Sequence, residues 1–364
     1  MVSRARPQIN GPILLFHGLS YLYGNVNSHE GRNPIFLLEV NNMYNQEIKE
    51  RFIKEAIENK SRKTTARNLF MNAARYEKSI GKDICQFTTD ELQPVVNDLF
   101  GMRTKSVGTN YSILKDYSKW CVEQGIEIEP DGIMELKFND EYGLDKLKSQ
   151  TVASPEHLQS YLDDLCDPVD ECTVDCVTRC YLWLAFSGVD EEAVLSVTAD
   201  NIDLVNMKII INDTEYPIYK EAVPAFENCV KSKVFMYKHP NYGAKIRHRA
   251  DSAWLLRGFS GARSLATLRS DTSRKCKRQR ESSISKCGPL NITYFRVQLS
   301  GIFYCVYVNE QAGVSPDFMD VAAKFMEGKT YKLDKSRNLP GAVQRRLAKE
   351  YMEDYTRWKK AYSL

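Results

Sequence analysis

The sequence contains no long apolar run. None of its 364 residues belongs to a stretch that approaches the roughly 20 apolar residues needed to span a bilayer. The apolar patch Ile13 to Phe16 is too short for a signal-peptide core, and no small-residue cleavage site follows it. Hydrophobic and charged fractions of 43% and 27% are typical of a soluble globular protein. We therefore expect a protein of one or two domains that remains in the cytoplasm.

Histidine is scarce, and it does not accompany the cysteines. Cys172, Cys176 and Cys180 are spaced to share one face of a helix. A zinc site needs two such pairs, or one pair with nearby histidines, and the nearest histidine is His157. The chain also has no export signal and no regular cysteine framework, so disulfides are not expected. Buried free thiols are the favoured interpretation, a metal site is the alternative, and no metal or cofactor is predicted.

Positive charge is concentrated in one part of the chain. The formal net charge is +3, but residues 231–300 hold sixteen Lys or Arg and only three acids, Asp251, Asp271 and Glu281. This block has a net charge of +13, which leaves −10 for the other residues. Such a block predicts a polyanionic partner, above all nucleic acid. A solvated basic loop without a partner is the alternative.

Residues 43–125 show a regular helical pattern. Helices are expected from Tyr44 to Ile57, from about Arg62 to Gly81 and from about Lys105 to Glu123, because apolar residues recur near the 3.6-residue period. Another is expected after Thr88-Thr89-Asp90-Glu91, where hydroxyls precede acids in the first turn. The pattern predicts a compact four-helix module, followed by a linker over residues 126–150.

Residues 151–364 are expected to form a second, mostly helical domain. Its first helix should begin at Ser154-Pro155, with proline at the first helical position. A β-hairpin is predicted around Asn212-Asp213. The other elements expected are a buried helix at 173–186, hairpin strands at 208–211 and 216–219, a short strand at 254–256, helices at 290–309 and 316–326, and a final amphipathic helix at 341–362.

This order of signals resembles the tyrosine recombinases (phage integrases). In that family a helix ends in a Thr-Gly-Leu-Arg box, which a Leu-x-x-x-Asp-Ile-Asp segment and a β-hairpin follow. Here Phe186-Ser187-Gly188-Val189-Asp190, the segment 195–203 and the hairpin occur in that order. Thr293-Tyr294-Phe295-Arg296 matches the later His-x-x-Arg box. The resemblance covers about residues 45–360. It implies a mainly α, two-domain fold, in which a four-helix, SAM-like module precedes a mostly helical domain with a small hairpin or sheet.

Most of the catalytic residues of that family are missing from this sequence. Its enzymes attack a phosphodiester with tyrosine, and arginines, a lysine and His or Trp groups stabilise the transition state. The first arginine position reads Asp190, the histidine of the second box reads Thr293, and Val297 follows Arg296. Loss of one electrostatic donor typically costs about a hundred- to a thousandfold in rate, so no enzymatic activity is predicted. Tyr331 matches the nucleophile in position only, and Lys208 and Lys220 are candidates for the family lysine.

The segment 291–315, with Leu299-Ser300-Gly301-Ile302-Phe303-Tyr304, also resembles recombinase-fold repressors of SPbeta-like Bacillus phages. This resemblance implies binding to double-stranded operator DNA and silencing of lytic genes, which maintains lysogeny without strand exchange. An antirepressor is a further candidate partner. The alternatives are an active integrase, which a covalent DNA adduct through Tyr331 would establish, and an accessory architectural factor, which would not repress a reporter.

The residues expected to contact DNA lie at basic helix starts and in the basic block. Arg274 to Arg280 are expected to be disordered until DNA is bound, and Arg296 is expected either to contact DNA or to pair with Asp190. The final helix is expected to pack on its own domain or on a second copy of the chain. The predicted contacts are Arg62, Lys63, Thr64, Arg67, Arg103, Lys105, Asn110, Lys245, Arg247, Arg249, Arg263, Arg269, Arg274, Lys275, Lys277, Arg278, Arg280 and Arg296.

Residues 1–42 differ from the rest, since they show neither helical nor strand periodicity. The residues Leu38 to Met43 can be back-translated to a string that holds the form of a bacterial ribosome-binding site just before ATG. We therefore hypothesise that Met43 is the true start and that 1–42 are an untranslated or disordered leader. The intact mass of the protein from its native host should correspond to a product that starts at Met43. A product that starts at Met1 would refute the hypothesis.

Overall fold

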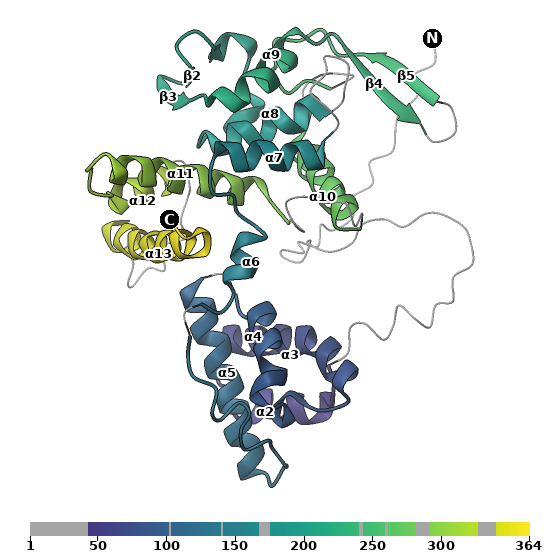
Figure 1. Cartoon of the computed structure of the whole chain (residues 1–364), viewed down its shortest axis with the longest axis vertical. Helices are drawn as coiled ribbons and strands as arrows, with labels where there is room; N and C mark the ends of the chain where they lie inside the picture. The colour runs from purple at the N-terminus through teal and green to yellow at the C-terminus, as the bar shows by residue number, and fades with distance from the viewer. Residues whose placement is uncertain are drawn as a thin grey trace, which may run out of the picture. The chain divides into compact units, whose positions relative to one another are not determined.

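The computed structural model describes residues 43–101, 103–139, 141–166, 175–239, 243–258, 261, 263–281, 291–326 and 340–364. The predictions for residues 1–42, Cys172 and Tyr331 lie outside these ranges. The predicted mainly α fold is confirmed, with two small sheets (Figure 1). None of the helices in the described ranges is both long enough and apolar enough to cross a membrane.

The first module consists of the four helices expected from the sequence. They are α2 (Gln46–Glu55), α3 (Lys60–Ile80), α4 (Thr89–Leu99) and α5 (Thr104–Glu123). The Thr88 hydroxyl accepts from the Glu91 N–H while the Glu91 carboxylate accepts from the Thr88 N–H. This capping box explains why α4 begins where its sequence signal predicts.

The core of this module combines packed aromatic rings with a buried ion pair. Phe52 contacts Phe70 and Tyr117 edge-on, with ring centroids 6.1 and 5.1 Å apart. Lys49 is fully buried; it forms an ion pair with Glu77 and donates to the Tyr44 carbonyl at 2.8 Å. Burial raises the pKa of Glu77 to about 7 although Lys49 acts in the opposite direction.

The region expected to be a linker is folded. Ile133, Leu136 and Tyr142 are buried in the core of the first module, and the short helix α6 (Leu144–Lys148) follows. The Tyr111 hydroxyl donates to the Leu136 carbonyl at 2.9 Å. A linker was predicted because the region contains Pro130 and Gly132. Its buried apolar residues were overlooked because they do not recur at a helical or strand period.

The second domain contains more elements than the sequence indicated. Its helices are α7 (Pro155–Leu165), α8 (Asp175–Phe186), α9 (Val223–Lys231), α10 (Leu265–Glu281), α11 (Tyr294–Gln311), α12 (Phe318–Met326) and α13 (Pro340–Tyr362), with 3₁₀ turns at Ala193–Leu195, Ala199–Asn201 and Lys220–Ala222. As predicted, Ser154 caps α7 by accepting from the His157 N–H at 3.2 Å. The sequence analysis missed α9, α10 and the second hairpin.

Two separate antiparallel sheets are present. β1 (Ile202–Asp203), β2 (Lys208–Ile211) and β3 (Thr214–Pro217) form one sheet, and β4 (Val234–His239) and β5 (Gly243–His248) form the other. Asn212 and Asp213 have φ values of 47° and 62°, as a two-residue primed turn requires. The second strand therefore begins at residue 214, earlier than predicted. The strand expected at 254–256 is reduced to one bridge between Trp254 and Thr198.

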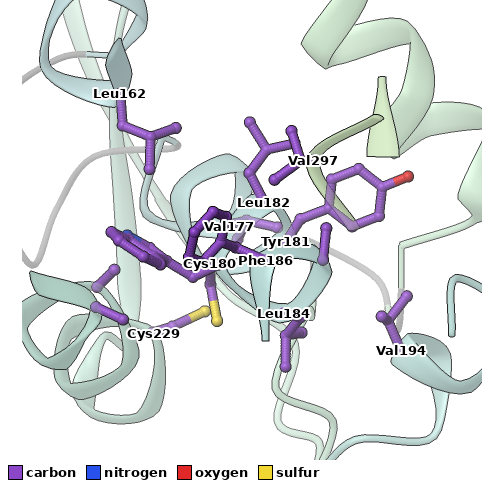
Figure 2. Close-up of a cluster of buried hydrophobic side chains, with 14 of the residues drawn as sticks. Leu162, Val177, Cys180, Tyr181, Leu182, Leu184, Phe186, Val194, Cys229 and Val297 are labelled. Carbon is purple, nitrogen blue, oxygen red and sulfur yellow. The ribbon is translucent and has the colours of Figure 1, made fainter. Parts of the chain in front are cut away.

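Helix α8 is buried on every side, and all twelve residues from Asp175 to Phe186 are buried. Figure 2 shows its side chains among those of α7, α9 and α11, with Cys180 and Cys229 close together. Cys176, Cys180 and Cys229 are buried free thiols. Within the described ranges, no cluster of histidine, cysteine or carboxylate groups has the arrangement of a metal site.

Helices α8 and α11 approach each other closely at Gly301. A Cβ atom added there would lie 1.8 Å from the Phe186 carbonyl oxygen and 2.6 Å from its carbon. The obstacle is backbone rather than a flexible side chain, so it cannot rotate away. Glycine at this position is therefore required for the contact between the two helices.

The variant Gly301→Ala should be destabilised by about 3 kcal/mol, because overpacking must push α8 and α11 apart. The matched control is Gly108→Ala in α5, where an added Cβ meets no atom within 4 Å. That variant should gain about 0.5–1 kcal/mol from the better helix propensity of alanine. Denaturant unfolding followed by circular dichroism measures both. Equal shifts of the two midpoints would contradict the proposed close contact.

Candidate nucleic-acid interface

The segment from Arg274 to Arg280 is helical, contrary to the expectation of disorder. It forms the second half of α10, which runs for 17 residues and packs against α7 and α8 (Figure 1). Leu268, Thr272, Lys275, Cys276 and Gln279 are buried, and their spacing defines one face of the helix. The composition concealed this face, because three of these five buried residues are polar.

Lys275, one of the predicted DNA contacts, belongs to this buried face. Its side chain is 9% exposed and forms an ion pair with Asp175 at the start of α8. A buried charge needs such a partner. Lys275 therefore joins α10 to α8 and offers little surface for the DNA contact that was predicted for it.

The opposite face of α10 is exposed and basic. It carries Arg274, Lys277, Arg278 and Arg280, and Thr267, Ser270 and Ser273 are exposed on the same side of the helix axis. Arg274 forms an ion pair with Asp271 on its own helix, and its side chain remains 69% exposed. We call Arg274, Lys277, Arg278 and Arg280 the α10 basic face. Cationic side chains beside hydroxyls on a regular helix suit contact with phosphate groups and base edges.

Arg249 and Arg263, two further predicted DNA contacts, have partners inside the protein. The Arg249 guanidinium is buried and donates to the carbonyl oxygens of Cys229 at 2.8 Å, Ser232 at 3.2 Å and Leu255 at 3.1 Å. Arg263 forms an ion pair with Asp271 in which both side chains are at most 14% exposed. Arg249 thus holds neighbouring loops against α9 through backbone carbonyls, and Arg263 is held against α10 through the Asp271 carboxylate.

Arg247 and Arg269 lie at the surface near these buried arginines. Arg247 is exposed on β5, and Arg269 of α10 makes a two-bond ion pair with Glu191 at 2.7 and 2.5 Å. The backbone of Lys245 is part of β5, and its side chain lies outside the described residues. Both arginine side chains are exposed, and Glu191 balances the charge of Arg269.

In the first module, too, some of the predicted basic contacts are paired within the protein and others are exposed. Arg67 binds Glu50 with two hydrogen bonds of 2.9 and 2.8 Å, and Arg62 binds Asp116 and Ser112. Lys63 is half-buried, and the Thr64 hydroxyl donates to the Lys60 carbonyl. At the start of α3, where DNA contacts were expected, both guanidinium groups therefore form ion pairs within the module.

At the start of α5, Arg103 contacts α13. Its Nε lies 3.0 Å from Asp354 Oδ2, and its Nη1 lies 3.5 Å from Glu350 Oε2. Lys105 is 79% exposed, with its Nζ 4.0 Å from Glu350. Asn110 donates to the Leu99 carbonyl at 3.2 Å. Lys105 is the most exposed of these three predicted contacts, and Arg103 and Asn110 are half-buried.

The two segments matched to recombinase boxes lie against each other. The Tyr294 hydroxyl donates to the Val189 carbonyl at 2.8 Å, and Gln298 Nε2 donates to the Gly188 and Val189 carbonyls at 3.3 and 3.0 Å. Gly188 has a φ of 93°, which favours glycine where the chain leaves α8. The geometry thus brings the end of α8 to the start of α11.

The residues at the matched catalytic positions do not form a phosphate-binding constellation. Asp190 is exposed, Val297 is buried, and Thr293 caps α11 by accepting from the Arg296 N–H. No ion pair joins Arg296 to Asp190 among the described residues, so that predicted pair is wrong. Burial lowers the pKa of the half-buried Arg296, nearby Arg103 lowers it further, and Asp354 raises it.

The lysine candidates do not complete the site. Lys208 forms an ion pair with Glu215 across the hairpin at 2.6 Å, and Lys220 lies 3.4 Å from Glu221 with 82% of its side chain exposed. The sequence analysis overlooked Asp354 and Glu350, whose carboxylates face the basic residues. Their signal was weak, because acids on an amphipathic helix are usually solvated.

Among the comparisons with known proteins, the match to a protein family falls within the first module. Residues 43–123 match the family described as "MrpR, N-terminal core-binding domain". In structure, the chain is similar to a XerA recombinase, with 11% identity, a TM-score of 0.33, and 85% of this chain and 98% of that chain covered. It is also similar to a Tn1549 transposon integrase (residues 82–397) in complex with circular intermediate DNA, with 13% identity, a TM-score of 0.30, and 82% and 97% coverage. No curated protein matches.

Arg249→Ala should lower the stability of the protein by about 3 kcal/mol or more, because several buried carbonyls lose a charged donor. Arg247→Ala, two residues away and exposed, should change it by less than about 0.5 kcal/mol. Thermal unfolding of both variants tests the assignment. If both melt at the wild-type temperature, Arg249 is not the structural anchor described here.

Proposed function

We propose that this protein is a sequence-specific repressor that binds double-stranded DNA and maintains the lysogeny of a temperate phage, on a recombinase-like scaffold that does not transfer strands. The observation that carries the DNA-binding part is the α10 basic face, which a folded helix presents to solvent. The family match over residues 43–123 supports a core-binding role for the first module.

The shape of α10 suits duplex DNA. A helix of 17 residues is about 25 Å long, and the major groove of B-DNA admits an α-helix. Arg274, Lys277 and Arg278 lie within about one turn of each other, where they can reach base edges or flanking phosphates. Packing of the buried face against α7 and α8 fixes the helix before DNA arrives, so little ordering cost accompanies binding.

The residues at the matched catalytic positions support a role without strand transfer. A scissile phosphate needs several cationic donors at its oxygens. Arg296 is the one cation among the four described matched positions, and the exposed Asp190 carboxylate would repel the phosphate. Binding would therefore not be followed by cleavage.

The repressor role rests on the resemblance of residues 291–315 to recombinase-fold phage repressors. In the structure this segment forms α11, which packs on α8 through Gly301. Operator DNA is the proposed partner, and an antirepressor and a second copy of the chain are further candidates. α13 packs on α12 in the same chain. This contact favours packing of the final helix on its own domain over packing on a second copy of the chain.

Single substitutions Arg274→Ala, Lys277→Ala and Arg278→Ala should each weaken binding to a DNA duplex. A variant that loses one phosphate contact should flatten the plot of log affinity against log salt by about 0.9. A variant that loses a base contact should instead lose about 1–3 kcal/mol at one base-pair position. Fluorescence anisotropy over a range of salt concentrations distinguishes the two.

The control is Lys231→Ala, which removes an exposed lysine from α9. It should bind DNA as the wild type does. All four side chains lie outside the core, so circular dichroism should show unchanged helix content. If the combined Arg274, Lys277 and Arg278 variant keeps wild-type affinity and salt dependence, α10 is not the DNA-binding element.

A further inference from the structure

A buried carboxylate on α13 lies beside Arg103, the residue that precedes α5. Asp354 of α13 is 8% exposed, and its Oδ2 atom lies 3.0 Å from Arg103 Nε. That oxygen nevertheless accepts no hydrogen bond, so the contact is electrostatic and imperfectly aligned. A buried oxygen without a donor is costly, and this one faces the cations at the start of α5 and α11.

The surrounding charges are mostly positive. Arg103, Arg296 and Arg357 all act on the Asp354 carboxylate and lower its pKa, yet burial raises the pKa to about 6. Arg103 and Arg296 also repel each other. Glu350, one turn before Asp354 on α13, contacts Arg103 at 3.5 Å and Lys105 at 4.0 Å. The two carboxylates therefore neutralise cations that come from α5 and α11.

A phosphodiester would satisfy the same cations better than a carboxylate with an unbonded oxygen. Guanidinium groups bind phosphate through paired hydrogen bonds, and Lys105 is exposed beside them. Arg103 and Lys105 belong to the first module, whereas Asp354 and Glu350 belong to α13. Exchange of carboxylate for phosphate would therefore remove one contact between α13 and the first module, while the bond of 2.6 Å from Arg357 to the Tyr142 carbonyl would still join them.

We propose that Asp354, assisted by Glu350, is an intramolecular competitor of DNA for Arg103: it holds this arginine in the free protein, and a DNA phosphate must displace it. This inference rests on the proposed DNA-binding function. If the free protein holds the carboxylate in place about nine-tenths of the time, the apparent affinity for DNA is reduced about tenfold.

The test compares Asp354→Asn with Glu353→Gln in the full chain. Both variants remove one negative charge from α13, but Glu353 faces only Lys349, at 4.0 Å on the same helix. With a random-sequence DNA duplex as the probe, Asp354→Asn should bind about tenfold more tightly than wild type, whereas Glu353→Gln should stay within about twofold. Equal affinities of the two variants would overturn the inference.

A double-mutant cycle separates competition from a merely structural ion pair. Arg103→Ala should reduce DNA affinity more in the Asp354→Asn background than in the wild type, because only there is the guanidinium free for DNA. An additive result would contradict the competition. If Asp354→Asn does not fold, Glu350→Gln provides the test, with an expected gain of about threefold; no gain would overturn the inference.

Failure of this inference differs from failure of the proposed function. If the wild type binds the duplex and Asp354→Asn binds equally well, DNA binding stands and the competition is wrong. If neither the wild type nor any variant binds duplex DNA, the proposed function itself is wrong.

Discussion

Complete burial of α8 is the constraint on which the second domain depends. Helices α9, α10 and α11 all pack against it, and its twelve residues have no solvent-exposed side. Gly301 permits α11 to reach the Phe186 backbone, and the Tyr294 and Gln298 side chains then bind the carbonyls that follow α8. The same helix anchors α10 through Asp175 and Lys275. One buried helix thereby fixes both the matched catalytic positions and the α10 basic face.

The positive charge of the second domain serves two purposes that sequence composition does not separate. Arg249, Arg263 and Lys275 are used inside the protein, where they satisfy carbonyls and carboxylates. The α10 basic face is exposed, as is Arg247, so this part of the charge is open to a polyanion. Arginine suits the internal role because its guanidinium has five donors in a rigid plane. A count of basic residues therefore overestimates the size of the interface.

Much of the fold could be predicted from local signals, because those signals act locally. The capping box at Thr88 and Glu91, the Ser154 cap and the Asn212-Asp213 turn each specify an end of an element. α10 was missed because its buried face contains Lys275, Thr272 and Gln279, whose burial depends on partners distant in sequence. The pairing of β4 with β5 was missed as well, since it lies in the charged block and lacks a clear period-two pattern.

The candidate site could be predicted only in outline. The sequence located the two segments that the structure brings together at Val189 and Tyr294, and it located the basic block. It did not reveal that Arg296 lies near Arg103 and Asp354 instead of Asp190, because that arrangement depends on α5 and α13 meeting at the start of α11. Contacts between elements far apart in the chain leave little trace in one sequence.

Immunoprecipitation of the protein with fragmented host and prophage DNA, followed by sequencing, tests the central claim most directly. A repressor should be recovered on several copies of one short motif, clustered at promoters. Recovery of a single site at a junction that resembles an attachment site would contradict the repressor account and assign the protein to recombination.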